Sequence, residues 1–345
     1  MLSPLFNHLL IPFIAAMFLA MTMGGSGIGP SFSAAYGANM IRKTAVAGIF
    51  GIMVFAGAIL AGKGTGYTLG KGILAPEFMQ YTTVTIILFS IGITLLISNL
   101  AGIPQSTSQA SVLAVVAASV YFKQPAFEFL IYKAAPTWFI LPVISYFISY
   151  IIARFLYRPM RKRAYFMRTS ERTNKVLRFF VILSSMYVAF SIGSNNVANA
   201  AGPIASMTIN ELQLADIGQN FLLIMIIATL MIAPVFGIGA SLFGDKVIKN
   251  TGKEIVLFGN IEAIIIATIT ASLLLFSSVV SGIPTSLVQL NVAAILGVGV
   301  AKLGPKNIFK KTEVNRFFVM WIIAPVISFV LTYVLLLIAD SLHLL

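Results

Sequence analysis

The chain has no cysteine among its 345 residues, which excludes disulfides and thiolate metal sites. Charge is scarce as well: charged residues make up 10% of the sequence, whereas soluble proteins carry roughly 25%. Ten residues are acidic and two are histidines, while apolar residues account for 59%. This composition predicts an all-α, polytopic integral membrane protein in the lipid bilayer of the cell membrane.

Ten apolar runs are candidates for membrane segments, since a helix needs about 20 apolar residues to cross a bilayer. The fourth and ninth are short, so we expect them to be re-entrant or partial helices. No Lys or Arg precedes Arg42, so the first run predicts an uncleaved span rather than a signal peptide. The runs are 8–23, 44–62, 81–100, 108–122, 136–156, 176–192, 217–243, 256–280, 288–301 and 317–340.

Basic residues predict the orientation, because they collect on the cytoplasmic side of membrane proteins. With both termini outside and one crossing per run, 19 of the 23 basic residues lie inside. The central basic linker is then cytoplasmic. The net charge of +13 is spread over short gaps between apolar runs, so we expect no nucleic-acid partner.

Two stretches occur twice, which is the first feature to look for in a chain of this kind. "GIPQSTSQASVLAVVAASV" from Gly102 resembles "GIPTSLVQLNVAAILGVGV" from Gly282, and "MGGSGIGPSFSAAYGANMI" from Met23 aligns more loosely with a stretch from Ile192. We therefore predict a first transmembrane repeat (1–156), a basic linker (157–175) and a second repeat (176–345). With about five segments each, an odd number, the second repeat is inserted upside down, as in secondary transporters.

Polar and glycine-rich residues cluster inside these repeats, where each cluster is expected to break a helix. Broken helices are tolerated in membranes only where they line protein or a cavity. Helix N-termini carry free N–H groups that attract anions, so four converging starts would form a cage for a small anion; helix packing and plain kinks are the alternative. The candidate binding residues are Gly25, Ser26, Gly27, Ser106, Thr107, Ser108, Gln109, Ser194, Asn195, Asn196, Asn199, Thr285, Ser286 and Gln289.

The stretch "GSNNVANA" from Gly193 resembles the Gly-Ala-Asn-Asp-Val-Ala-Asn-Ala signature of the inorganic phosphate transporter (PiT) family. The "GIPxS" segments are similar to that family's Pro-x-Ser-Thr-Thr stretches, and the resemblance covers nearly the whole chain outside the linker. The first-half copy is eroded and keeps only Gly24 and a pattern of small residues. The resemblance implies an inverted-repeat transporter driven by sodium or protons.

The two signature acids of that family are absent, because Gly27 and Asn196 stand at their positions. Hydrogen phosphate must donate a proton, so a carboxylate acceptor helps to bind it. Sulfate near pH 7 only accepts hydrogen bonds, and a carboxylate would repel it. The chain looks closest to the family's sulfate permease (CysP-like) branch. We therefore predict a sulfate importer, with thiosulfate or another tetrahedral oxyanion as further substrates and phosphate as the alternative.

Import of a dianion into a negative-inside cell must be coupled to an energy source. The stretch "GKGTGYTLGKG" (62–72) lacks the glycine and hydroxyl positions of a nucleotide-binding P-loop, and we expect it to be an external loop. Glu262 lies in an apolar run and is the proton-coupling candidate. The alternative is that its side chain reaches the membrane interface or pairs with Lys253. Loss of the signature acids favours proton over sodium symport. No cofactor or metal is expected.

Other classes of protein fit less well. "GGSG" (24–27) matches a motif of intramembrane serine proteases, but those enzymes need a helical histidine and only His343, near the last residue, is available. We therefore expect a transporter, not an enzyme. His8 and Asp340 are expected at the membrane interface. A passive anion channel would share the same site chemistry, a scaffold would bind no substrate, and the small residues permit a homodimer.

Overall fold

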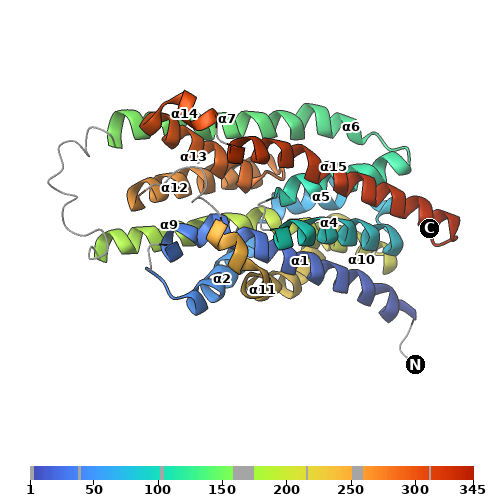
Figure 1. Cartoon of the computed structure of the whole chain (residues 1–345). Helices are drawn as coiled ribbons and strands as arrows, with labels where there is room; N and C mark the ends of the chain where they lie inside the picture. Colours follow the sequence, from blue (N-terminus) through green and yellow to red (C-terminus); the bar gives the residue numbers. More distant parts are fainter. Residues whose placement is uncertain are drawn as a thin grey trace.

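The computed structural model describes residues 4–37, 40–101, 105–157, 175–214, 217–250, 259–310 and 312–345. Within these ranges the chain forms helices and no strands (Figure 1). The first half comprises α1 (Pro4–Gly37), α2 (Lys43–Ala61), α3 (Lys63–Tyr67), η1 (Thr68–Gly72), η2 (Pro76–Phe78), α4 (Tyr81–Ala101), α5 (Thr107–Tyr121), α6 (Ala126–Phe129), η3 (Leu130–Ala134), α7 (Ala135–Ile151) and η4 (Ile152–Tyr157). The second half comprises α9 (Lys175–Asn196), α10 (Ala198–Glu211), α11 (Ile217–Asn250), α12 (Asn260–Phe276), η6 (Ser277–Ser281), α13 (Leu287–Leu303), α14 (Pro305–Phe309) and α15 (Thr312–Ser341).

Each of the ten predicted apolar runs coincides with a helix, but fewer than ten of the described helices can cross a membrane. Seven are long and apolar enough, or eight when α2 and the segment 63–72, bent by 71°, count as one span. The short fourth and ninth runs are α5 and α13, of 15 and 17 residues. At 1.5 Å per residue they reach about 22–26 Å, less than the roughly 30 Å of hydrocarbon.

Two expectations about helix breaks are wrong. The stretch "GGSGIGP" does not interrupt α1, which is continuous from Pro4 to Gly37. Its first glycine serves packing instead, because a Cβ on Gly24 would lie 2.1 Å from the Phe236 carbonyl oxygen of α11. "GSNNVANAAGP" causes only a one-residue interruption, at Val197, whose φ and ψ stay helical. The expected four helix starts are therefore reduced to two.

The segment 62–72 is also not an external loop. It forms α3 and η1, with Thr65 and Leu69 fully buried. Its glycines allow this segment to pack closely, since a Cβ on Gly70 would meet the Gly202 carbonyl oxygen at 2.6 Å and one on Gly64 would meet the Ser278 carbonyl oxygen at 2.4 Å. The pattern that resembles a phosphate loop is a helix-packing surface.

The two short helices belong to helical hairpins. α4 packs against α5, and α12 packs against α13. Figure 1 shows the two hairpins extending to opposite sides of the centre of the molecule. Each short helix begins after an extended serine, Ser106 or Ser286, that caps it. The second hairpin turns through Gly282, whose φ of +65° is in the left-handed region that favours glycine.

The contacts between the two halves occur in matching pairs. α1 packs on α11 as α9 packs on α2, and α7 packs on α13 as α15 packs on α5. The closest approaches match too: a Cβ on Gly193 of α9 would lie 2.0 Å from the Val54 carbonyl oxygen of α2, the counterpart of Gly24 against Phe236. Ser145 of α7 donates to the Leu290 carbonyl oxygen (2.8 Å) and Ser328 of α15 donates to that of Ala110 (3.0 Å). This pairing supports the two-repeat interpretation, while the inverted insertion of the second repeat stays a prediction.

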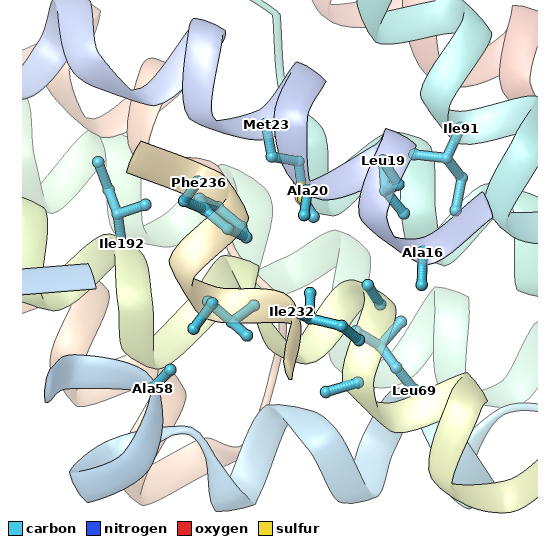
Figure 2. Packing of buried hydrophobic residues seen from close by; sticks show 14 of the residues in the cluster. Ala16, Leu19, Ala20, Met23, Ala58, Leu69, Ile91, Ile192, Ile232 and Phe236 are labelled. Atoms are coloured by element: carbon cyan, nitrogen blue, oxygen red, sulfur yellow. The ribbon is translucent and has the colours of Figure 1, made fainter. Parts of the chain in front are cut away.

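The buried core runs through the centre of the bundle. Figure 2 shows Leu19 and Met23 of α1 close to Ile232 and Phe236 of α11, all fully buried, with Leu69 of η1 on the far side. Large apolar side chains on the outer helices are exposed, among them Phe139, Ile322 and Leu60. A fully apolar exterior is what a helix bundle presents to lipid.

The two ends of the chain lie at the same end of the bundle (Figure 1). η4 and α9, which flank the predicted linker, reach the opposite end. Residues 158–174 of that linker lie outside the described residues. Asp340, in the last turn of α15, and His343, just beyond it, are exposed, and the predicted orientation across the membrane stays a prediction.

Candidate oxyanion site

The hairpin tips bring two helix N-termini together at the centre of the bundle. In α5 the Ser106 hydroxyl oxygen accepts the N–H of Gln109 at 3.2 Å, and in α13 the Ser286 hydroxyl oxygen accepts the N–H of Gln289 at 3.2 Å. The two glutamines then meet, with Gln289 Nε2 donating to Gln109 Oε1 at 3.0 Å. Since each N-terminus carries free N–H groups and a partial positive charge, their convergence favours an anion.

Asn195 connects the two tips. Its side-chain amide lies 2.7 Å from the Ser108 hydroxyl of α5 and 2.9 Å from the Ser278 hydroxyl of η6. With the amide nitrogen facing Ser108, it also donates to the carbonyl oxygen of Thr285 at 3.0 Å and accepts the N–H of Thr285 at 3.3 Å. In that orientation the amide nitrogen is also 3.1 Å from Oδ1 of Asn196. This one buried side chain therefore contacts α9 and both hairpins.

A small cavity lies beside these contacts. Six of the predicted binding residues line it: Ser26, Gly27, Ser106, Thr107, Asn196 and Ser286. The other lining residues are Pro30, Gln105, Ile192, Leu287 and Val288. No charged residue lines it. Its volume of about 10 Å³ is close to the roughly 10–15 Å³ that one water requires. A tetrahedral oxyanion is larger than a water, so the tips must separate before one can enter.

Both positions of the missing signature acids line this cavity. Gly27 lies on α1 and Asn196 at the end of α9, yet they reach the same space. A Cβ on Gly27 would lie 3.2 Å from the Phe50 ring and 3.4 Å from Ile192, which leaves little room for a carboxylate. The cavity therefore has no carboxylate at either place where the family signature has acids, since Gly27 has no side chain and Asn196 carries a neutral amide.

The remaining predicted residues lie away from the cavity. Gly25 packs against Phe243 and the amide of Asn99. The Ser194 hydroxyl donates within its own helix to the Ser191 carbonyl oxygen at 2.8 Å, while its carbonyl oxygen accepts the Thr65 hydroxyl at 2.9 Å. Asn199 Nδ2 contacts the Met23 sulfur at 3.7 Å. Ser108, Gln109, Thr285 and Gln289 belong to the hydrogen-bond network of the tips rather than to the cavity wall.

Two residues of the tips are not among the sequence predictions. Gln105 lines the cavity, and its Oε1 accepts the Ser98 hydroxyl while its Nε2 has no partner. Ser278 holds Asn195. The repeat offset of 180 residues places Ser98 opposite Ser278, so extending the alignment upstream of Gly102 would have found both serines.

Glu262 lies in the first turn of α12 and is almost fully buried (1% exposed). Its Oε2 accepts the Gly259 N–H at 2.7 Å, and its Oε1 pairs with Lys302 Nζ at 2.8 Å. The predicted partner Lys253 lies outside the described residues. Both carboxylate oxygens have partners here, and the coupling role of Glu262 stays a prediction.

Three buried amide oxygens, Oδ1 of Asn99, Oδ1 of Asn199 and Oε1 of Gln289, have no hydrogen-bond partner among the described residues. Asn99 Nδ2 donates to the Thr22 carbonyl oxygen at 2.7 Å and Asn199 Nδ2 contacts Met23, so these two asparagines are held against α1. Within the described ranges no group of three or more His, Asp or Glu could hold a metal ion.

Comparison with known proteins places this architecture in a family. The model of the phosphate transporter family matches residues 23–332. The sulfate permease CysP of Bacillus subtilis is 32% identical over 321 residues, which are 93% of this chain and 85% of the relative. A solved structure described as the sodium-dependent phosphate transporter superposes with a TM-score of 0.68 at 21% identity, covering 97% of this chain and 99% of that one. By the extent of the family match, and by the resemblance to the permease over nearly its whole length, the chain belongs to the phosphate transporter family.

Proposed function

We propose that the protein is a secondary active transporter that imports an inorganic oxyanion, with sulfate as its main substrate. The observation that carries the proposal is the convergence of Gly27 and Asn196 on one cavity beside two helix N-termini. The cavity wall offers neutral donors and no charged group. Thiosulfate or another tetrahedral oxyanion fits the same description.

The absence of a carboxylate from the cavity wall favours sulfate over hydrogen phosphate. Sulfate accepts hydrogen bonds and donates none, so neutral donors satisfy it completely. Hydrogen phosphate carries a proton that needs an acceptor, and a carboxylate would supply one. In a site of low dielectric constant, a carboxylate near a dianion costs several kcal/mol by order of magnitude. The similarity to a sulfate permease agrees with this preference.

Phosphate is the alternative substrate, since the family and a solved structure that this chain resembles are named for phosphate. A passive channel is a further alternative that would share the same site chemistry, and dependence of uptake on a cation gradient distinguishes a coupled transporter from it. The family alignment also favours transport over the serine-protease alternative, and the Ser26 hydroxyl donates to the Met23 carbonyl oxygen of its own helix at 3.0 Å.

Uphill import requires a coupled cation, because each negative charge costs about 2.3 kcal/mol per 100 mV on entering a negative-inside cell. We propose a proton as that cation. The two signature acids are replaced by Gly27 and Asn196, and Glu262, a buried carboxylate in the first turn of α12, is our candidate for carrying the proton. Sodium is the alternative coupling ion, and the unpartnered oxygens of Asn99 and Asn199 would be its ligand candidates.

The proposed orientation places both termini outside and the linker in the cytoplasm, with the second repeat inverted relative to the first. The position of both chain ends at one end of the bundle (Figure 1) agrees with this arrangement. In the predicted topology 19 of the 23 basic residues fall in the gaps on the same side of the membrane as the linker, which supports a cytoplasmic location for that side. A homodimer stays part of the proposal.

The test is uptake of labelled sulfate into proteoliposomes, with and without an inward proton gradient and with phosphate or sodium added. We expect gradient-dependent sulfate uptake that excess phosphate leaves unaffected. Uptake of labelled phosphate, or sulfate uptake blocked by phosphate, would contradict the substrate. Sulfate uptake that follows a sodium gradient instead would contradict the proposed ion alone.

A further inference from the structure

A second cavity lies next to the central one. It is formed by α1, α9, α12 and α13 and has a volume of about 30 Å³, room for about two waters. Pro30 of α1 lines both cavities, so the turn of α1 around this residue separates them. The polar side chains of the second cavity are Ser31, Ser33, Ser184, Ser185 and Asn291.

Asn291 is the most informative of these residues. It lies in the second turn of α13, is only 9% exposed, and its side-chain amide makes no hydrogen bond with any described residue. Ser185 of α9 is 2% exposed and is likewise without a partner. By contrast, the Ser31 hydroxyl donates to the Gly27 carbonyl oxygen at 2.9 Å. A polar side chain that is largely buried and has no protein partner can form hydrogen bonds only with what occupies the cavity, so Asn291 and Ser185 are suited to a ligand that enters it.

The cavity lies on the linker side of the central site. Continuing past Pro30, α1 leads toward Gly37 and then Arg42, and α13 leads from Asn291 to Lys302, about three helical turns along the same face. Lys302 is 22% exposed and pairs with Glu262, the neighbour of the lining residue Ala263. An anion that moves along this face passes from neutral donors to the ion pair of Lys302 and Glu262.

The corresponding position in the first repeat is different. The repeat offset of 180 residues places Ser111 of α5 opposite Asn291. The Ser111 hydroxyl is fully buried and donates to the Thr107 carbonyl oxygen of its own helix at 3.0 Å. The donor that lacks a partner is therefore a property of the second repeat alone.

We propose that the second cavity is an intermediate binding site for the oxyanion on its way from the central site to the linker end of the protein. Asn291 and Ser185 donate hydrogen bonds to the anion there, and the α1 turn at Pro30 is the partition that the anion passes. The inference rests on the proposed function, since it assigns a route to the anion that the central site binds.

The absence of cysteine allows a direct test without a prior cysteine-free variant. Single variants Ser185→Cys and Asn291→Cys are reconstituted and treated with a membrane-impermeant methanethiosulfonate that carries a sulfonate group. Ser111→Cys is the matched control in the first repeat. Lys175→Cys and Lys123→Cys, both at exposed positions, report access from the linker end and from the opposite end.

We expect both cavity variants to react from the side on which Lys175→Cys reacts, and saturating sulfate to slow the reaction about fivefold or more by occupancy. Modification should abolish sulfate uptake. Ser111→Cys should stay unreacted. Reaction from the side of Lys123→Cys, no reaction, or a rate that sulfate leaves unchanged would each overturn the proposed route.

Uptake by each unmodified variant and by the parent chain distinguishes failure of the proposed route from failure of the proposed function. When the parent and Ser185→Cys both take up sulfate but modification does not inhibit Ser185→Cys, the route is wrong and the proposed function stands. When the parent takes up no sulfate, the proposed function fails and the route fails with it. Ser185→Cys changes only an oxygen to a sulfur, so it keeps the test available where Asn291→Cys does not fold.

Discussion

The two halves of the molecule are alike in how their helices pack and different in the polar groups they place at the centre. Gly24 and Gly193 approach the facing backbone at nearly equal distances, and both short helices start with the same Ser–Gln capping contact. Two and three positions further along the motif the halves differ: the first has Ser26 and Gly27, the second Asn195 and Asn196.

This difference separates the requirements of the fold from those of the site. The fold needs close helix crossings in both halves, so small residues stand at both crossings. The site needs hydrogen-bond donors around one anion, and both halves contribute polar side chains to the cavity wall: Ser26, Gln105, Ser106 and Thr107 from the first, Asn196 and Ser286 from the second. The second half also supplies Asn195, whose amide connects three helical elements beside the cavity, whereas its counterpart Ser26 donates only within α1.

The largest expected effect is the loss of packing in either half. Gly193→Ala would place a Cβ 2.0 Å from the Val54 carbonyl oxygen, and Gly24→Ala creates the same overlap with Phe236. Each should cost about 3 kcal/mol or more in stability by overpacking. Thermal unfolding in detergent checks this. Gly48→Ala is the control, because no atom lies within 4 Å of its Cβ position; equal melting temperatures for all three variants would contradict the shared crossing.

Asn195→Ala should remove the amide contacts that distinguish the second half from the first. Removing this amide leaves buried partners unsatisfied at about 1–3 kcal/mol each, so we expect sulfate uptake to fall about tenfold or more. Ser26→Ala, the repeat counterpart, should lower uptake by a much smaller factor because it removes one bond within a helix. Initial rates of labelled sulfate uptake at matched protein amounts measure both. A larger loss for Ser26→Ala would reverse the assignment.

Glu262→Gln tests the coupling, which has no counterpart in the first half. Glutamine keeps an acceptor for the Gly259 N–H but cannot carry a proton. We expect proton-driven accumulation of sulfate to be lost while exchange of internal for external sulfate continues. Accumulation that still follows the proton gradient would place the proton elsewhere. Lys302→Gln, which removes the cation of the ion pair but keeps the carboxylate, is the comparison variant.

The smallest effects should be equal in the two halves. Ser106→Ala and Ser286→Ala each remove a helix N-cap, which costs about 1 kcal/mol. Each variant should therefore lower the melting temperature by a similar amount, and threonine at either position should restore most of it. A loss confined to one variant would show that the two tips do not bear equivalent caps.

The sequence predicts the positions of the helices well, because long apolar runs in a polytopic protein have few other structures available. It also indicates the short α5 and α13 by length alone. It fails at "GGSGIGP" and at residues 62–72, where glycine was interpreted as a break or a loop. In the sequence, a glycine that lets a second helix approach cannot be distinguished from a glycine that breaks a helix. The backbone that approaches, at Phe236 or Gly202, is distant in the sequence.

The residues of the site could be predicted only in part, because most of its contacts join segments that are distant in the sequence. The repeated "GIPxS" segments identify Ser106 and Ser286 directly. The contact between Gln109 and Gln289, the bridge from Asn195 to Ser278, and the convergence of Gly27 with Asn196 depend on how α1, α9 and the two hairpins pack. Such contacts join residues 83 to 180 positions apart, beyond any local pattern.

The most direct test of a donor-only site is the Asn196→Asp variant, which restores a carboxylate at one signature position. Uptake of labelled sulfate and of labelled phosphate would be measured side by side at pH 7 for this variant and the parent. Repulsion between the new carboxylate and the dianion predicts a sulfate rate lower by about tenfold or more and a ratio shifted toward phosphate. An unchanged sulfate rate would show that Asn196 does not face the anion and would contradict the account of selectivity.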